Sequence, residues 1–478
     1  QDILFWSLFA AFSGLCALPL VAAWRRSRIA AADRRGPDLM APAGPFFLVV
    51  FVLFGLGSVY GWTGLDQQHD HPNPLPGLVL ATFGLGAFAI GYHLPIVSRT
   101  PSIAGRLPRW RPRRAVLAAL LCATIGIAGA VAAFSSTEYF FGTQENISVD
   151  LSSPLGFLQE LLFVGLCMLA IVAGSSLSRR RAQVLLLLVA GAVSAALLPT
   201  GHRFYLFIVL GSLGIPWHYY IQRIRISWMA ALAAFTILAL NPVGQLWRTE
   251  YHALGASGPG DIPTVAAGVA QDLASMTGSG YLDYAIGQRF ERLNEAATVS
   301  ALLNTVPSVA GYKYGATYLP MVTWVVPRFF WPNKPTFQFF NDIGRATGLI
   351  APNDQQTTVV YTSIGELYLN FGYPGVPLGM FALGLLFRWL YQALMSGPRN
   401  ETAVLAYSLL VFPLWSVEEA LGPALGGAVR DVVAGLLLLL VCGALVREAR
   451  PRRAPEDRWD AAAARLPAAP GSVPGSAS

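Results

Sequence analysis

The sequence predicts an all-α protein built as a polytopic bundle of about 11 transmembrane helices, with one large, partly helical loop outside the bilayer. Of its 478 residues, 54% are hydrophobic and only 12% are charged, whereas a soluble domain carries about 25% charged residues. The apolar residues come in runs of about 20, the length that crosses ~30 Å of hydrocarbon. Both observations exclude a water-soluble protein of this size.

The apolar runs divide the chain into four parts. We expect spans one to eight within residues 1–243, an external loop region at 244–372, the last three spans within 373–446 and a disordered tail at 447–478, where Ala, Pro and Arg are abundant. The expected spans cover residues 3–24, 44–63, 75–97, 115–134, 154–177, 184–200, 204–222, 227–243, 374–395, 402–417 and 424–446. Within the loop region, residues 265–274, 287–304 and 358–370 are expected to be helical.

Basic residues predict the orientation. Every odd-numbered span is followed by arginines, for example six between Arg99 and Arg114 after the third span. The connections at 66–76 and 135–153 contain neither Lys nor Arg. The positive-inside rule then places the N-terminus outside and the C-terminus in the cytoplasm, which agrees with an odd number of spans.

Side chains that bind metals are poorly grouped. His69, Asp70 and His71 form the only local cluster, and no zinc-binding spacing or phosphate-binding glycine loop is present. The acidic residues Glu160, Glu418, Glu419 and Asp431 are scattered along the chain, so the sequence does not indicate a proton relay. The four cysteines lie in apolar runs and predict buried thiols. We expect no metal, no cofactor and no nucleic-acid partner.

Two external arginines are candidates for anion binding. Arg203 ends a tight turn, Pro199–Arg203, between two spans, and Arg248 follows the eighth span. A charge so close to the bilayer is costly unless it is paired or bound to a ligand. Both would face the same outer vestibule, at the depth of the phosphates of a lipid-linked diphosphate. The alternatives are snorkelling for Arg203 and, for basic residues of the loop, surface ion pairs with acids such as Asp342.

A second group combines cations with aromatic rings. Arg328 and Lys334 flank Trp331 in a segment stiffened by prolines, residues 326–335. Guanidinium groups bind phosphates and aromatic rings stack on sugars, although the same segment could be a rigid turn packed on the membrane. The apolar stretch 318–331 could dip into lipid, but we assign it to the outside.

A third group leads the chain back into the membrane at residues 365–375. Glu366 and Asn370 are four positions apart and would share a helix face. Desolvation would raise the pKa of Glu366, as a general base often requires. A structural strut, with Glu366 paired to an arginine, is the alternative, and the sequence does not separate the two roles.

These motifs resemble those of bacterial oligosaccharide repeat-unit polymerases, the Wzy-type O-antigen polymerases, and more distantly those of O-antigen ligases. The resemblance covers about residues 200–376 and depends on Thr200–Arg203, on Pro327–Arg328 with 331–335, and on 365–375. It implies a GT-C-like glycosyltransferase of the bacterial inner membrane. Such an enzyme transfers a growing glycan from one undecaprenyl diphosphate to the non-reducing end of another lipid-linked repeat unit, and a chain-length regulator would be a protein partner.

The resemblance also implies roles for residues. Arg203 and Arg248 would bind the donor diphosphate, assisted by Arg328 and Lys334, with Arg203 and Glu366 as the catalytic pair. The glycan path would be lined by Tyr312, Tyr314, Tyr318, Trp324, Trp331 and Asn370.

There are departures from the family pattern. Tyr361 and Thr362 stand where ligases look as if they carry a His-Asn pair, and His202 stands where many relatives have Ser. Three alternatives remain: an O-antigen ligase, a polyprenyl-phosphate-sugar transferase using Asp66 and Asp70, and a flippase or transporter of lipid-linked glycans.

Overall fold

The computed structural model describes most of the chain, and the described part is mostly helical, as predicted. The described residues are 1–29, 38–63, 72–135, 154–197, 203–235, 238–239, 241–255, 259–276, 278, 280–281, 284, 293–323, 325–326, 330–331, 333, 338–355 and 357–446. The predicted tail at 447–478 lies outside them.

Six helical stretches among the described residues are long and apolar enough to cross a membrane. They lie in α1 (Asp2–Ile29), in the continuous run of α2 (Ala43–Val50), η1 (Phe51–Leu56) and α3 (Gly57–Trp62), and in α4 (Leu75–His93), α6 (Pro112–Ser135), α17 (Thr362–Met395) and α19 (Leu421–Val441). Each coincides with an expected span, namely the first four, the ninth and the eleventh. The prediction of a helical membrane protein is confirmed to this extent.

The other five expected spans also coincide with helices, which are not among these six candidates. They are α7 (Pro154–Ser176), α8 (Arg179–Leu197), α9 (Arg203–Pro216) with η4 (Trp217–Ile221), α10 (Ile226–Phe235) and α18 (Glu401–Trp415). In α7 and α18 the apolar stretches are Glu160–Ser176 and Glu401–Trp415. The total of about 11 spans therefore stays a prediction.

The expected external region contains short helices rather than spans. They are α11 (Asn241–Ala253), η6 (Pro259–Asp261), α12 (Ile262–Ser275), α14 (Glu295–Thr305), η7 (Ala316–Tyr318), α15 (Leu319–Thr323) and α16 (Phe339–Ala346). The helices expected at 265–274 and 358–370 correspond to α12 and to the first part of α17. The helix expected at 287–304 corresponds to α14, and residues 287–292 lie outside the described residues.

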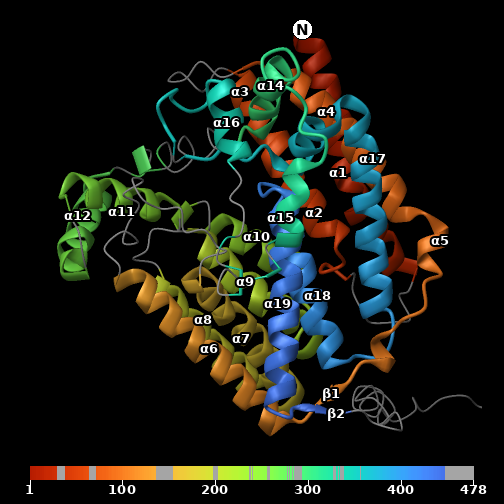
Figure 1. Cartoon of the computed structure of the whole chain (residues 1–478), viewed down its shortest axis with the longest axis vertical. Helices are drawn as coiled ribbons and strands as arrows, with labels where there is room; N and C mark the ends of the chain where they lie inside the picture. Colours follow the sequence, from red (N-terminus) through yellow and green to blue (C-terminus); the bar gives the residue numbers. More distant parts are fainter. Residues whose placement is uncertain are drawn as a thin grey trace, which may run out of the picture.

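Three of the basic loops meet at one end of the bundle, which we call the basic end. Two short strands, β1 (Arg109–Trp110) and β2 (Leu445–Val446), pair there in antiparallel register, beyond α5 (Pro95–Ser98) and η2 (Ala104–Arg106). The Asn400 side-chain amide donates to the Leu107 carbonyl at 2.9 Å, so the segment after the ninth expected span also joins this group. Segments that follow the third, ninth and eleventh expected spans are thus neighbours (Figure 1).

The N-terminus, the helix ends that flank the second connection and part of the loop region meet at the opposite end, which we call the loop end. The Gly77 N–H at the start of α4 donates to the Ser300 hydroxyl of α14 at 2.9 Å. The Trp62 indole at the end of α3 donates to Asp2 at 3.0 Å. Figure 1 shows α3, α14 and the N-terminus together at the top, far from β1 and β2. This separation is the one that the charge pattern predicts.

Helices α4 and α17 pack at close range along a seam of glycines. A Cβ atom on Gly384 would collide with the Phe88 carbonyl and lie 2.9 Å from the Tyr92 amide nitrogen. A Cβ atom on Gly91 would collide with the Phe381 carbonyl. Small residues let membrane helices approach this closely.

We expect Gly384→Ala to lower the melting temperature, because the added methyl group must push the α4 backbone away at a cost of about 1–3 kcal/mol. The matched control is Gly191→Ala in α8, where an added Cβ meets nothing within 4 Å and alanine favours the helix. Thermal unfolding of purified protein in nanodiscs measures both. Equal melting temperatures for the two variants would show that the seam is looser than described.

Candidate functional site

The carboxylate of Glu366 connects three segments at the loop end. It lies in the second turn of α17 and is fully buried. The Thr317 hydroxyl donates to its Oε1 at 2.7 Å, and the Leu421 N–H donates to its Oε2 at 2.6 Å. Leu421 begins α19, whose N-cap residue, Ala420, provides no side-chain hydrogen bond. Glu366 therefore caps α19 from another helix, where a negative charge is favoured by the helix dipole.

Asn370 extends this network from the same face of α17, as the spacing predicts. Its side-chain amide donates to the Thr317 hydroxyl at 2.7 Å, and its Oδ1 accepts the Gly315 N–H at 2.8 Å. The Lys313 N–H also donates to the Leu369 carbonyl at 2.9 Å. We call Thr317, Glu366, Asn370 and the Leu421 N–H the polar clamp. It holds residues 313–318 along the first part of α17.

Gly372 divides α17 into two parts. The first part carries Glu366 and Asn370 of the polar clamp, and the second part is the long apolar stretch that follows. Gly372 has φ +67° and ψ −161°, a backbone conformation that residues other than glycine rarely adopt. A Cβ atom there would also lie 3.0 Å from the Tyr312 hydroxyl. Both constraints favour glycine at this position.

Aromatic rings surround the polar clamp. The Tyr318 ring stacks on Phe371 with centroids 6.3 Å apart, and Tyr312 meets the edge of Tyr368 at 6.1 Å. Tyr314 is 80% exposed. Flat rings with polar edges suit the faces and hydroxyls of sugars. The structure thus brings together five predicted site residues, namely Glu366, Asn370, Tyr312, Tyr314 and Tyr318.

The hydrogen bonds favour the structural role of Glu366, one of the two that the sequence left open. A general base must come within about 2.6–3.2 Å of the proton that it takes. Both oxygens of Glu366 already accept hydrogen bonds, and the side chain has no exposed surface. Its partners are a hydroxyl and a helix N-terminus rather than the arginine that the strut hypothesis named.

Three further carboxylates lie at the loop end. Glu295 begins α14, and Glu418 and Glu419 lie in the turn between α18 and α19. The Ser363 N–H donates to the Val417 carbonyl at 3.1 Å, which ties this turn to the start of α17. Burial and then the charge of Glu418 raise the pKa of Glu419 to about 7, and the same causes raise the pKa of Glu295. Glu419, with its pKa near neutral pH, can therefore exchange protons under physiological conditions.

The predicted cations are only partly described. Arg203 is the first residue of α9 and Arg248 lies in α11, but the side chains of both lie outside the described residues. Arg328, Lys334 and Trp324 also lie outside the described residues. Trp331 is described and 41% exposed. Arg345 pairs with Asp342 at 2.7 Å, which is the surface ion pair proposed as the alternative to ligand binding.

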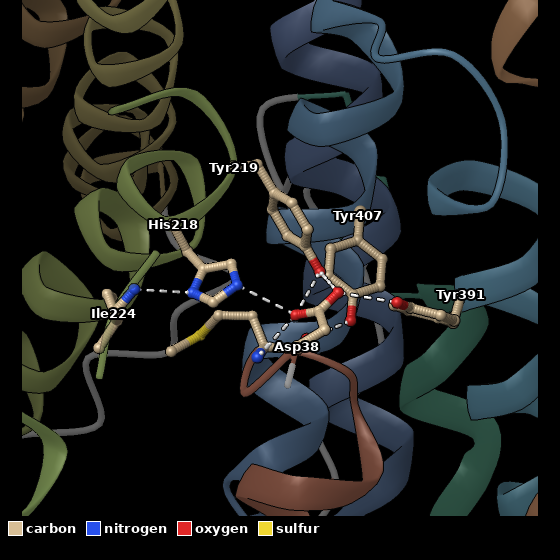
Figure 2. A network of polar contacts seen from close by, with 7 residues as sticks. Asp38, His218, Tyr219, Ile224, Tyr391 and Tyr407 are labelled. Atoms are coloured by element: carbon tan, nitrogen blue, oxygen red, sulfur yellow. Dashed lines mark hydrogen bonds and ion pairs between the residues drawn. The ribbon is translucent and has the colours of Figure 1, made fainter. Parts of the chain in front are cut away.

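A second polar cluster, which the sequence analysis did not find, lies at the basic end (Figure 2). The Asp38 carboxylate accepts hydrogen bonds from the hydroxyls of Tyr219 at 3.0 Å and Tyr391 at 2.7 Å. His218 Nε2 lies 3.1 Å from Asp38 Oδ1. The Ile224 N–H donates to His218 Nδ1 at 3.1 Å, which assigns the ring proton to Nε2, facing the carboxylate.

The Asp38 cluster joins four elements. The Met40 N–H donates to Asp38 at 3.0 Å, and the Tyr407 hydroxyl of α18 donates to the Met40 carbonyl at 2.6 Å. The turn before α2 is therefore held to η4, α17 and α18. No local pattern marks the cluster, because Tyr219 and Tyr391 lie 181 and 353 positions from Asp38.

A buried ion network connects α7 with α19. Arg430 is 3% exposed and pairs with Glu160 of α7 and, at 3.2 Å, with its neighbour Asp431. Glu160 and Asp431 looked scattered in the sequence, but the helix packing places both beside one arginine. Buried charges of this kind need partners because their desolvation is costly.

Within the described part of the chain, no group of three or more His, Cys, Asp or Glu residues could hold a metal ion. The cluster at His69–His71 lies outside that part. All four cysteines are free thiols, and Cys16, Cys122 and Cys167 are buried.

No protein-family model, no curated protein and no solved structure matches the chain. The assignment of function therefore depends on the residues and their arrangement.

Proposed function

We propose that the chain is a membrane glycosyltransferase that polymerises undecaprenyl-diphosphate-linked oligosaccharide repeat units into an O-antigen or capsule-like polysaccharide. It would span the bacterial inner membrane about 11 times, with the basic end in the cytoplasm and the loop end in the periplasm. The motifs at 200–203, 326–335 and 365–375 support the enzyme class, and the meeting of three basic loops at one end supports the orientation.

One observation carries the location of the site. Residues 312–318 and 366–370 are held together by the polar clamp, and tyrosine rings surround them at the end opposite the basic loops. A lipid-linked sugar with its diphosphate at the membrane surface would meet this end first. Exposed Tyr314 and the Tyr318–Phe371 pair offer ring faces for the glycan.

The proposed reaction is a displacement at the anomeric carbon of the donor glycan. A hydroxyl of the acceptor sugar attacks this carbon, the bond to the carrier diphosphate breaks, and undecaprenyl diphosphate leaves. Arg203 and Arg248, supported by Arg328 and Lys334, would stabilise the charge that develops on the diphosphate. The hydroxyl proton must pass to a base, and Glu366 could take it only if its buried carboxylate became accessible to the acceptor.

The test is a reconstituted reaction. Purified protein in liposomes is incubated with undecaprenyl-diphosphate-linked repeat units in the presence of EDTA, and the glycans are separated by length on a gel. A ladder of lengths is expected. Folded protein that yields no ladder from a competent substrate would reject the polymerase, and lipid A core would then be tested as the acceptor of a ligase.

Substitutions of the polar clamp distinguish a strut from a base. If Glu366 is a strut, Glu366→Gln and Thr317→Val should each lower stability by about 1–3 kcal/mol, because each leaves a buried polar group without its partner. Turnover should fall in proportion to stability in both. If Glu366 is a general base, the pattern differs. The kcat of Glu366→Gln should then fall by about 10²–10⁴-fold, while the kcat of Thr317→Val should stay near the wild-type value. Melting temperature and ladder formation are measured in parallel.

A further inference from the structure

Helix α15 packs against the beginning of α19. The chain just before α15 lies on Gly422, where a Cβ atom would be 2.6 Å from the Thr317 carbonyl oxygen and 3.2 Å from the Tyr318 Cα atom. Figure 1 shows α15 at the upper end of α19. The polar clamp fixes this arrangement, because Thr317 and Leu421 bind the same carboxylate.

Helix α15 approaches one face of α19 near its N-terminus, and the same face of α19 is exposed nearer its C-terminus. Val429, Val433, Leu437 and Leu440 are 40–62% exposed, and their spacing of three or four residues places them on one side of the helix. Gly422 precedes Val429 by seven residues and continues the same side. The exposed stripe therefore stops where residues 317–323 begin to cover it.

The length of α19 places the covered part inside the membrane. The helix has 21 residues and is about 31 Å long, so all of it is needed to cross ~30 Å of hydrocarbon. The exposed stripe begins only at Val429, about 10 Å along the axis from Gly422. Whatever covers the first turns of α19 must then lie at the depth of the same leaflet.

The outer surface of α15 suits that depth. Leu319, Met321 and Val322 are 52%, 39% and 67% exposed, while Pro320 and Thr323 face the protein and are buried. Residues 314–327 include no charged side chain. Backbone donors are used locally, since the Tyr318 N–H donates to Gly315 at 3.0 Å and the Val326 N–H to Thr323 at 3.3 Å. Lipid tolerates a backbone whose polar groups are satisfied in this way.

We infer that α15 is embedded in the leaflet at the loop end, where Leu319, Met321 and Val322 contact the acyl chains. The lipid-facing stripe of α19 continues onto α15, and the polar clamp sets the depth at which the helix is held. Lipid is favoured over a protein partner as the occupant of this surface because the surface is continuous with the exposed face of a membrane-spanning helix.

Spin labels test the inference. Single cysteines replace Leu319 or Val322, the labelled protein is reconstituted in liposomes, and collisions with oxygen and with a water-soluble nickel chelate are measured by power saturation. Val433→Cys on α19 is the control for lipid, and Val309→Cys, 72% exposed in the loop region, is the control for water. Cys442→Ser removes the half-buried native thiol, and the three buried thiols stay unlabelled.

The measured quantity is the ratio of the collision rate with oxygen to that with the nickel chelate. We expect this ratio at positions 319 and 322 to be close to the ratio at 433 and several-fold above the ratio at 309. A ratio like that at 309 would overturn the inference, because the surface would then face water. Labels that neither reagent reaches would also overturn it, because a protein partner or a second copy would then cover the surface. Two labelled positions guard against one that disturbs the fold.

Discussion

Arg203→Ala is expected to abolish chain elongation while the protein still folds in the membrane. Arg203 begins α9 at the boundary of an expected span, and we propose that its guanidinium group binds the donor diphosphate. Removing one fixed group that stabilises charge in a transition state typically costs about 10²–10³ in kcat. In the reconstituted assay, the ladder should shrink to single repeat units at an unchanged melting temperature.

The controls for Arg203 separate a specific role from a general effect of charge. Arg345→Ala removes another arginine predicted to lie outside the membrane, whose partner is the exposed Asp342, and exposed pairs contribute only about 0–1 kcal/mol. It should leave the ladder intact. Arg203→Lys should recover part of the activity, because an ammonium group keeps the charge but lacks the two-pronged geometry. Full polymer length in Arg203→Ala would remove this residue from the proposed mechanism.

The sequence predicted features that depend on local composition. Hydropathy located the helices because each span must be apolar over its own length. The arginine clusters predicted which connections lie together, and β1 with β2 confirms one such meeting. The spacing of Glu366 and Asn370 predicted their common face, since four residues complete about one helical turn.

Features that depend on distant contacts could not be predicted in this way. Thr317 lies 49 positions from Glu366, and Leu421 lies 55 positions from it. The cap that Glu366 provides allows α19 to begin at Leu421, whereas local hydropathy placed the span at 424–446. The Asp38 cluster is a similar case, because its partners come from three helices that are distant in the sequence.

The second large effect is expected at Asp38, the centre of the cluster at the basic end. Asp38→Ala removes the acceptor shared by His218, Tyr219 and Tyr391. Asp38→Asn removes the charge and replaces one of the two accepting oxygens by an NH2 donor. Each hydrogen bond to a charged group typically contributes about 1.5–3 kcal/mol, and Asp38 accepts several. We therefore expect a large fall in melting temperature in nanodiscs. Tyr391→Phe removes one of these hydrogen bonds and should lower stability by only about 1.5–3 kcal/mol.

The dependence of the Asp38 effect on pH follows from its pKa. Burial alone would raise this pKa, but the interactions with His218, Tyr391 and Tyr219 lower it below its ordinary value. Such a carboxylate stabilises the fold above the unfolded pKa of about 3.9, and the contribution is lost as pH falls through the folded pKa. Wild type should therefore keep this stabilisation at neutral and mildly acidic pH.

At pH 7, Asp38→Asn should already lack the stabilisation that the wild-type protein loses only in strong acid. The difference in melting temperature between the two proteins is expected to be constant from pH 7 to about pH 5. It should narrow below about pH 4, because the Asp38 carboxyl is protonated first in the unfolded chain and only at lower pH in the folded protein. Asp342→Asn, at a half-exposed ion pair, is the matched control and should show little difference at any pH. A difference at Asp38 that persists unchanged into strong acid would mean that the shape of the side chain, and not its charge, holds the four elements together.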